Sequence, residues 1–186
     1  MLKSDLIKKI KSGGIAVMPT DTIYGIVACA INKSAVEKVY EIRRRQPDKP
    51  FIILISSIND LSLFDIKLSK FQKDFLNNNW PDALSVVLPC YSKNFNYLHR
   101  GSKTLAFRYP DKKSILDILK KTGPLIAPSA NPEGLVPASD IKDARKYFGD
   151  SIIYYGRGKL FGLASTLVSI IDDKINILRQ GTVTIK

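Results

Sequence analysis

Short runs of apolar and β-branched residues recur along the whole chain, separated by segments that carry helix start and stop signals. Runs of roughly 4–8 such residues are typical of strands in a largely buried sheet, although periodicity alone does not exclude short buried helices. We place these runs at residues 15–18, 51–55, 85–88, 104–107, 125–127, 151–155, 166–171, 175–178 and 182–185.

Helix signals lie between these runs. The sequence predicts a helix from Ser4 to the Gly13-Gly14 pair, and one over 34–43 that opens with a capping-box pattern. Further helices are expected from Ser69, over 114–121 and over 139–147. Helices and strands that interleave in this way predict a mixed α/β class. Neither a repeat nor a linker divides the chain, so residues 1–186 are expected to form a single domain.

The chain is strongly basic, with 29 Lys and Arg against 17 Asp and Glu and a formal net charge of +12. This charge predicts attraction to polyanions such as nucleotides, RNA or acidic surfaces. A surface of solvated lysines would give the same charge, so charge does not choose among them. The sequence has no apolar run long enough to span a bilayer, and its amphipathic start does not resemble a secretory signal. We therefore expect no membrane association and a cytoplasmic protein.

Cysteine and histidine are scarce, with two cysteines and one histidine in the chain. The two cysteines, Cys29 and Cys90, lie in apolar stretches and are expected to be buried free thiols. The single histidine, His99, is expected in a loop or at the surface, and no protein-bound metal is expected. The sequence contains no P-loop, GxGxxG or GxSxG motif. These absences exclude ATP binding by a Walker or Rossmann mechanism and disfavour a serine or cysteine hydrolase.

Polar residues follow the first predicted strand directly. Residues 19–25 read Pro-Thr-Asp-Thr-Ile-Tyr-Gly and bring hydroxyls, a carboxylate and a phenol behind an apolar run. Such residues could line a ligand cleft at the edge of a sheet. A simple polar turn, with Asp21 bonded to the local backbone, would explain them equally well.

A cluster of cations ends the second predicted helix: Arg43, Arg44, Arg45 and, after Pro47, Lys49. Cations in a last helical turn are favoured by the helix dipole, which is a purely structural explanation. The same cluster would also bind a polyphosphate, because arginine presents a planar fork and lysine a compact charge.

Weaker signals of the same kind lie at other predicted strand ends. Ser129 and Asn131 stand between two prolines, Ser165 precedes the strand over 166–171, and Arg179 stands near Gly181. Each signal is weak by itself.

Taken in order, these segments resemble the YrdC-like family, which includes the bacterial threonylcarbamoyl-AMP synthases. The resemblance rests on seven segments, each given with the family motif that it resembles: PTDTIYG at 19–25 (PTDT-x-YG), RRR at 43–45 (KxR), WPDALS at 80–85 (WPGPLT), FRYP at 107–110 (VRxP), SAN at 129–131 (SxN), STLV at 165–168 (STxV) and ILRQG at 177–181 (ILRxG). It covers the chain from about residue 5 to the end. One such motif arises easily by chance, whereas the whole series in the right order does not.

The resemblance implies a twisted mixed sheet flanked by helices around a basic concave cavity. It also implies a nucleotidyltransferase reaction, in which L-threonine and bicarbonate give N-carboxythreonine, whose new carboxylate attacks the α-phosphate of ATP. Pyrophosphate leaves, and the product supplies the N6-threonylcarbamoyladenosine modification of tRNA, directly or through a threonylcarbamoyl transferase complex. Mg²⁺ would accompany ATP and be held chiefly by its phosphates.

The family pattern also implies site residues. ATP would be bound by Arg45, Lys49, Thr104, Asn131, Ser139 and Arg179, and threonine by Thr22, Arg108, Ser129 and Ser165. Arg43 and Arg45 would assist catalysis, with Arg43 in place of the family lysine. This replacement keeps the charge but changes the shape.

Two other functions remain open at this stage. A basic RNA-binding module without chemistry would explain the charge but not the hydroxyl-bearing strand ends. A family paralogue with an altered substrate would be expected to lose part of PTDT-x-YG or KxR, and only the lysine has changed here. The sequence ends soon after ILRxG and resembles the short, single-domain form of the family.

Overall fold

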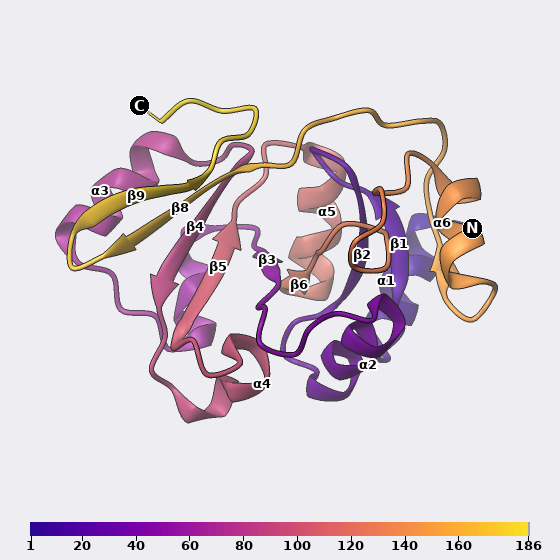
Figure 1. Cartoon of the computed structure of the whole chain (residues 1–186), viewed down its shortest axis with the longest axis horizontal. Coiled ribbons are helices and arrows are strands. Elements are labelled where there is room, and N and C mark those ends of the chain that lie inside the picture. The colour runs from indigo at the N-terminus through magenta and orange to yellow at the C-terminus, as the bar shows by residue number, and fades with distance from the viewer. Residues whose placement is uncertain (186) are drawn as a thin grey trace.

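The computed structural model describes residues 1–185, and within them nine strands form one mixed sheet (Figure 1). The strands are β1 (Ala16–Pro19), β2 (Tyr24–Cys29), β3 (Ile52–Leu54), β4 (Leu84–Pro89), β5 (Thr104–Arg108), β6 (Leu125–Ile126), β7 (Ile153–Tyr154), β8 (Thr166–Ile171) and β9 (Lys174–Arg179). Their order in the sheet is β7-β1-β2-β6-β3-β5-β4-β8-β9. The pairs β1–β7, β3–β5 and β4–β8 are parallel and the other pairs are antiparallel.

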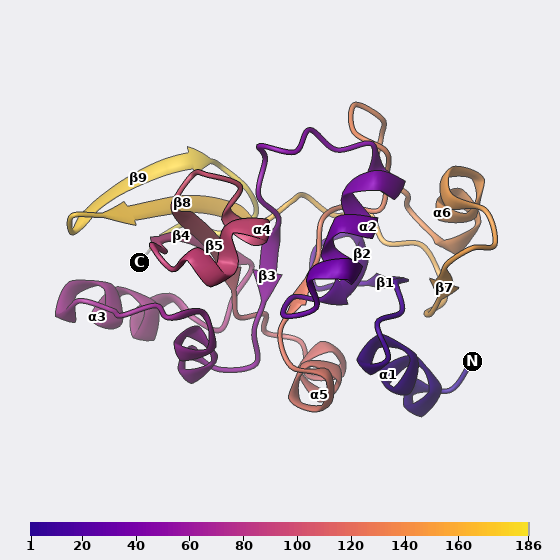
Figure 2. The same cartoon turned by 90° about the horizontal axis from the view of Figure 1, so that it is seen from below.

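The helices are α1 (Lys3–Lys11), α2 (Lys33–Arg43), α3 (Lys70–Asn79), α4 (Asn96–His99), α5 (Lys113–Thr122) and α6 (Ile141–Phe148), with 3-10 turns η1 (Ile58–Phe64) and η2 (Lys93–Phe95). In Figure 2, α1, α3 and α5 lie in a row below the strands. Helix α2 packs against β2, and α6 contacts β1. The predicted mixed α/β fold, with one sheet flanked by helices, is confirmed.

Two apolar clusters hold the helices to the sheet. In the larger, Ile26 and Ile53 of the sheet and the ring of Phe107 pack with Phe64 of η1, and all are fully buried. In the smaller, Leu6 of α1 packs with Ile118 of α5 and Leu54 of β3. Burial of this kind contributes about 25 cal/mol per Å² of apolar surface, so the sheet is a firm support for the loops at its edges.

Strand β2 was not predicted, and it changes the interpretation of the polar segment at 19–25. Pro19 of β1 pairs with Tyr24 of β2, so β1 and β2 form a hairpin whose loop is residues 20–23. All six residues of β2 are buried, and residues 26–29 form an apolar run like those of the predicted strands, but Tyr24 and Gly25 were interpreted as the end of the polar segment.

Other local predictions were wrong in detail. Residues 182–185 form no strand, and Val183 instead bonds the hydroxyl of Thr166 through its backbone. Helix α2 is capped by Asn32, which accepts the Ala35 N–H, rather than by Ser34. The helix expected from Ser69 is present as α3, and a capping box between Ser69 and Gln72 opens it.

The burial of the two cysteines was predicted correctly, and that of the single histidine was not. Cys29 and Cys90 are buried free thiols, as predicted. His99 is buried rather than exposed, and its Nδ1 accepts the Gly101 N–H at 3.1 Å, which satisfies the ring at the end of α4. Within residues 1–185, no helix has the length and apolar character needed to cross a bilayer.

Candidate functional site

A cavity of about 180 Å³ lies where the 20–23 loop meets the end of α2 and the ends of β5, β8 and β9. The topology brings these ends together. Because β5 is antiparallel to β4 and β4 is parallel to β8, Arg108 at the end of β5 pairs with Ser85, which pairs with Leu167 at the start of β8. Gly25 of β2 bridges to Ser129, which adds the SxN segment to the same wall.

The hydroxyl of Thr20 closes the 20–23 loop. It donates to the Ile23 carbonyl at 2.7 Å and accepts the Thr22 and Ile23 amides at 3.2 and 3.3 Å. Its oxygen also lies 3.2 Å from the Thr22 hydroxyl. The segment is therefore both a closed polar turn and a cavity wall, and the turn fixes Thr22 at the cavity.

Arg108 and Asp21 form a buried ion pair. Arg108 Nη2 donates to Asp21 Oδ1 at 2.9 Å, and the two side chains are only 5% and 8% exposed. Burial lowers the pKa of Arg108, and the charge of Asp21 opposes that shift. Asp21 Oδ2 and Arg108 Nε are buried and have no hydrogen-bond partner in residues 1–185. Asp21 was missed as a site residue because nothing in the sequence indicates that it meets a side chain far along the chain.

Arg43 is buried beside the cavity without a carboxylate in ion-pair distance among residues 1–185. Its Nε donates to the Asn131 carbonyl at 2.8 Å, and its Nη2 donates to Ser129 Oγ at 3.2 Å and Asn131 Oδ1 at 3.5 Å. Burial, reinforced by the charge of Arg45, lowers the pKa of Arg43 to about 10, so it remains a cation at neutral pH. A buried cation held only by neutral oxygens favours an anionic ligand.

Arg45 and Lys49 share one carboxylate, that of Glu133. Arg45 Nη1 and Lys49 Nζ each lie 3.1 Å from Glu133 Oε1, and the Gln46 amide donates to Oε2 at 2.7 Å. The Gln46 hydrogen bond, and then Lys49, lower the pKa of Glu133. Arg45 lines the cavity, whereas Lys49 lies next to it on the same loop.

Arg179, at the end of β9, also lines the cavity. Its Nε and Nη2 donate to the Ser165 carbonyl at 3.1 and 2.9 Å, and Nη2 also lies 3.3 Å from Ser165 Oγ. Ser165 Oγ is in turn 2.8 Å from Ser85 Oγ. Partial burial lowers the pKa of Arg179. The cavity therefore has guanidinium groups on two sides and hydroxyls between them.

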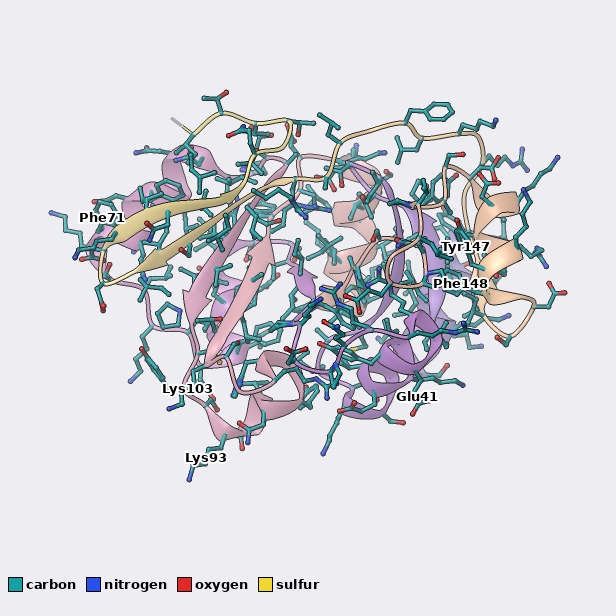
Figure 3. The ribbon with its side chains drawn as sticks, in the orientation of Figure 1. Glu41, Phe71, Lys93, Lys103, Tyr147 and Phe148 are labelled. Carbon is teal, nitrogen blue, oxygen red and sulfur yellow. The ribbon has the colours of Figure 1, made fainter. Side chains whose placement is uncertain are left out.

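A second cavity, of about 680 Å³, adjoins the first, because Ile23 and Ala164 line both. Its walls are mainly apolar and include Tyr147 of α6, which is labelled in Figure 3, and Phe161. Ser139 lines it, and its hydroxyl donates to Asp143 at 2.8 Å. An extended ligand could occupy both cavities.

The predicted site residues other than Thr104 fall into three groups. The first cavity is lined by Thr22, Arg43, Arg45, Arg108, Ser129, Ser165 and Arg179. Asn131 and Lys49 stand directly behind this lining, and Ser139 lines the second cavity.

Thr104 lines neither cavity formed by residues 1–185. It starts β5, whose other end is Arg108, and the two side chains share one face of the strand. Because Ile52 of β3 pairs with Ala106 of β5, the loop that carries Lys49 enters the sheet level with Thr104. Thr104 is therefore on the Lys49 side of the site. Its ligand role stays a prediction.

The side chains around the cavities do not resemble a metal site. Within residues 1–185, no group of three or more His, Cys, Asp or Glu side chains comes together as metal ligands would. The acidic groups nearest the first cavity, Asp21 and Glu133, are each paired with cations.

Comparison with known proteins identifies relatives along nearly the whole chain. The Sua5/YciO/YrdC family model, described as "Telomere recombination", matches residues 8–181. The chain is 31% identical over 179 residues to a Bacillus subtilis protein named threonylcarbamoyl-AMP synthase, covering 94% of this chain and 52% of that one. It is also 31% identical over 180 residues to a Mycobacterium tuberculosis protein named putative threonylcarbamoyl-AMP synthase, covering 94% of this chain and 82% of that one.

A solved structure has the same fold. The crystal structure of P. abyssi Sua5 complexed with L-threonine superposes with a TM-score of 0.87 at 28% identity, over 96% of this chain and 54% of that chain. The chain thus spans about half the length of the Bacillus and P. abyssi relatives and most of the mycobacterial one. With a family model that matches residues 8–181 and a shared fold, the chain belongs to the Sua5/YciO/YrdC family.

Proposed function

We propose that this protein is an L-threonylcarbamoyladenylate synthase, which forms threonylcarbamoyl-AMP and pyrophosphate from L-threonine, bicarbonate and ATP. The observation that carries the proposal is Arg43, a buried cation held by neutral oxygens at a cavity that also presents Arg45, Arg179 and four hydroxyl side chains. Relatives named threonylcarbamoyl-AMP synthase and the threonine complex of P. abyssi Sua5 support the same activity.

Threonine would occupy the first cavity. Its volume of about 180 Å³ suits an amino acid, whereas sites for larger ligands generally run from about 300 to 1,000 Å³. The α-carboxylate of threonine would accept hydrogen bonds from Arg108, which Asp21 holds in place. Thr22, Ser129 and Ser165 would contact the remaining polar atoms.

ATP would extend from this cavity in two directions. Its α-phosphate would meet threonine in the first cavity, and its nucleoside would enter the larger apolar cavity beside Ser139. The β- and γ-phosphates would lie toward Arg45 and Lys49 and reach along β5 toward Thr104. Arg179 would contact the α-phosphate from the opposite wall, and Asn131 would act through Arg43. Mg²⁺ would enter as the ATP complex, held mainly by phosphate oxygens.

The chemistry needs positioning and charge more than a base. The threonine amine forms a bond to the bicarbonate carbon and water leaves, which gives N-carboxythreonine. A carboxylate oxygen of that product bonds to the α-phosphorus while the bond to the β-phosphate oxygen breaks. The nucleophile is already an anion, so a catalytic His or Cys is unnecessary. Arg43 and Arg45 would stabilise charge on the transferred group and on the leaving pyrophosphate.

The product is a mixed anhydride, which hydrolyses easily and must be consumed by an acyl-accepting partner. We propose that it is passed to tRNA for N6-threonylcarbamoyladenosine formation, directly or through a threonylcarbamoyl transferase complex. That role would place the protein in the cytoplasm and class it as a nucleotidyltransferase.

The first test is pyrophosphate release from MgATP with and without L-threonine and bicarbonate. Release that requires both substrates is expected, and serine and glycine should support much less. Release that is independent of threonine would contradict the proposal and favour a family paralogue with another substrate.

The net charge of +12 is also consistent with one other function, that of a basic module that binds RNA without catalysing a reaction. Its affinity for RNA should fall steeply with added salt, because counterions are released on binding. Binding of threonine and ATP should depend less on salt. A protein that binds RNA but releases no pyrophosphate would favour this alternative.

A further inference from the structure

Glu133 stands where the phosphates of a nucleotide are expected. Its Oε1 accepts from Arg45 and Lys49 at 3.1 Å each, and its Oε2 accepts the Gln46 amide at 2.7 Å. A carboxylate with two cations and a backbone N–H around it is bound as a phosphate group would be. The chain thus supplies an internal anion to its own cationic loop.

The main chain of Glu133 makes a separate contact with the end of α2. The Glu133 amide donates to the Arg43 carbonyl at 2.8 Å, and the neighbouring Asn131 anchors the Arg43 side chain. The main chain of Glu133 is therefore fixed against the end of α2 by a contact that does not involve its carboxylate. The side chains of Glu133, Arg45 and Lys49 are 22%, 25% and 47% exposed, so an incoming polyanion can reach them.

The arrangement sets up a competition. Lys49 and Arg45 each have one carboxylate partner in residues 1–185, and it is the same one. A triphosphate that binds both cations has to displace Glu133 or lie beside it, and two anions side by side repel. We propose that Glu133 sets the affinity of this site for polyphosphates by occupying Arg45 and Lys49 until a nucleotide displaces it. This inference rests on the proposed function, because it takes Arg45 and Lys49 as phosphate ligands.

The test is the binding of inorganic tripolyphosphate to the full chain and to Glu133→Gln, measured by calorimetry at fixed salt. Gln keeps the length of the side chain and removes its charge. Two partly exposed ion pairs are replaced, so the variant should bind tripolyphosphate about tenfold more tightly. Glu133→Asp keeps the charge and should stay within about threefold of the unmodified protein.

Glu41→Gln is the matched control, because it makes the same change in net charge. Glu41 is exposed on α2 and projects into solvent (Figure 3). It should leave tripolyphosphate affinity unchanged within about twofold. If Glu41→Gln tightens binding as much as Glu133→Gln, net charge explains the effect and the inference is overturned.

Kinetics separate competition from a merely structural role. Glu133→Gln should lower the KM for ATP and leave kcat close to that of the unmodified protein, since ground-state affinity alone has changed. Unchanged or weaker tripolyphosphate binding by folded Glu133→Gln would overturn the inference, and so would a fall in kcat with KM unaltered.

Failure of the proposed function would look different. Tripolyphosphate binding requires neither threonine nor turnover, so tighter binding by Glu133→Gln upholds the competition even if no threonine-dependent pyrophosphate release is found. Release that proceeds normally, with equal tripolyphosphate affinity in both proteins, overturns the inference alone.

Discussion

Arg108 and Asp21, 87 residues apart in the chain, meet as a buried ion pair with Arg108 Nη2 2.9 Å from Asp21 Oδ1. The pair joins the 20–23 loop of the β1–β2 hairpin to the end of β5. It links the two halves of the sheet across the cavity wall. The pair stabilises the fold, because each buried charge neutralises the other. It also orients Arg108 beside the cavity.

Replacing Asp21 should therefore affect both stability and threonine binding. Asp21→Asn leaves Arg108 buried without a neutralising charge, which should lower the free energy of unfolding by about 3 kcal/mol. The KM for threonine should rise because Arg108 is no longer held. Urea unfolding and threonine-dependent pyrophosphate release measure the two effects.

Asp117→Asn is the control for the stability effect. Asp117 pairs with Lys3 at 2.8 Å, but these side chains are 40% and 41% exposed. Water and salt screen exposed ion pairs, so this variant should lose little stability. Equal losses of unfolding free energy in the two variants would mean that the buried Arg108–Asp21 pair stabilises the fold no more than an exposed pair does.

Arg43 should be required for turnover rather than for substrate affinity alone. Arg43→Met removes a cation placed to stabilise charge in the transition state, and kcat should fall by about 10²–10³-fold. Pyrophosphate release under saturating substrates measures this. Arg43→Lys restores the charge found in the family motif and should recover most of the rate. Equal rates in all three proteins would remove Arg43 from the mechanism.

The Glu133 interactions predict a pH dependence of stability. Gln46 and Lys49 lower the pKa of Glu133 in the folded protein, so its ionised form contributes stability above its ordinary pKa of 4.5. This contribution is lost as the pH falls from 4.5 through the lowered pKa, where the folded state takes up its proton. The difference in unfolding free energy between the unmodified protein and Glu133→Gln should be constant near pH 7.

That difference should then shrink as the pH falls below 4.5, as urea unfolding at a series of pH values would show. Glu41→Gln provides the baseline, since Glu41 is exposed on α2. A difference that stays constant down to pH 3 would show that the ionisation of Glu133 does not couple to folding.

Much of the sheet was predictable because its strands are short runs of β-branched residues. Strands β8 and β9, for example, carry Val168, Ile170 and Ile175 at the expected places. Strand β2 carries a similar apolar run at residues 26–29, but it was missed because its first residues, Tyr24 and Gly25, were assigned to the polar segment. In the fold, β2 pairs with its neighbour β1 and with β6, which comes much later in the sequence.

The residue types of the site were predictable from motifs, but their partners were not. Asp21 was interpreted either as part of a ligand cleft or as a turn residue bonded to the local backbone, and its ion pair depends on a strand 87 residues away. Glu133 carried no signal, since a glutamate after Asn131-Pro132 is unremarkable in sequence. It meets Arg45 only because the Ser129–Asn131 segment folds onto the end of α2.

The two ends of the proposed ATP site should be separable by mutation. Thr104→Val should weaken tripolyphosphate about fivefold through one lost hydrogen bond and leave AMP binding unchanged, because Thr104 is on the Lys49 side of the site. Ser139→Ala should do the reverse, because Ser139 lines the cavity proposed for the nucleoside. Calorimetric titration of both variants with both ligands gives a crossed comparison. If both variants weaken the same ligand, the phosphates and the nucleoside do not extend in opposite directions from the first cavity.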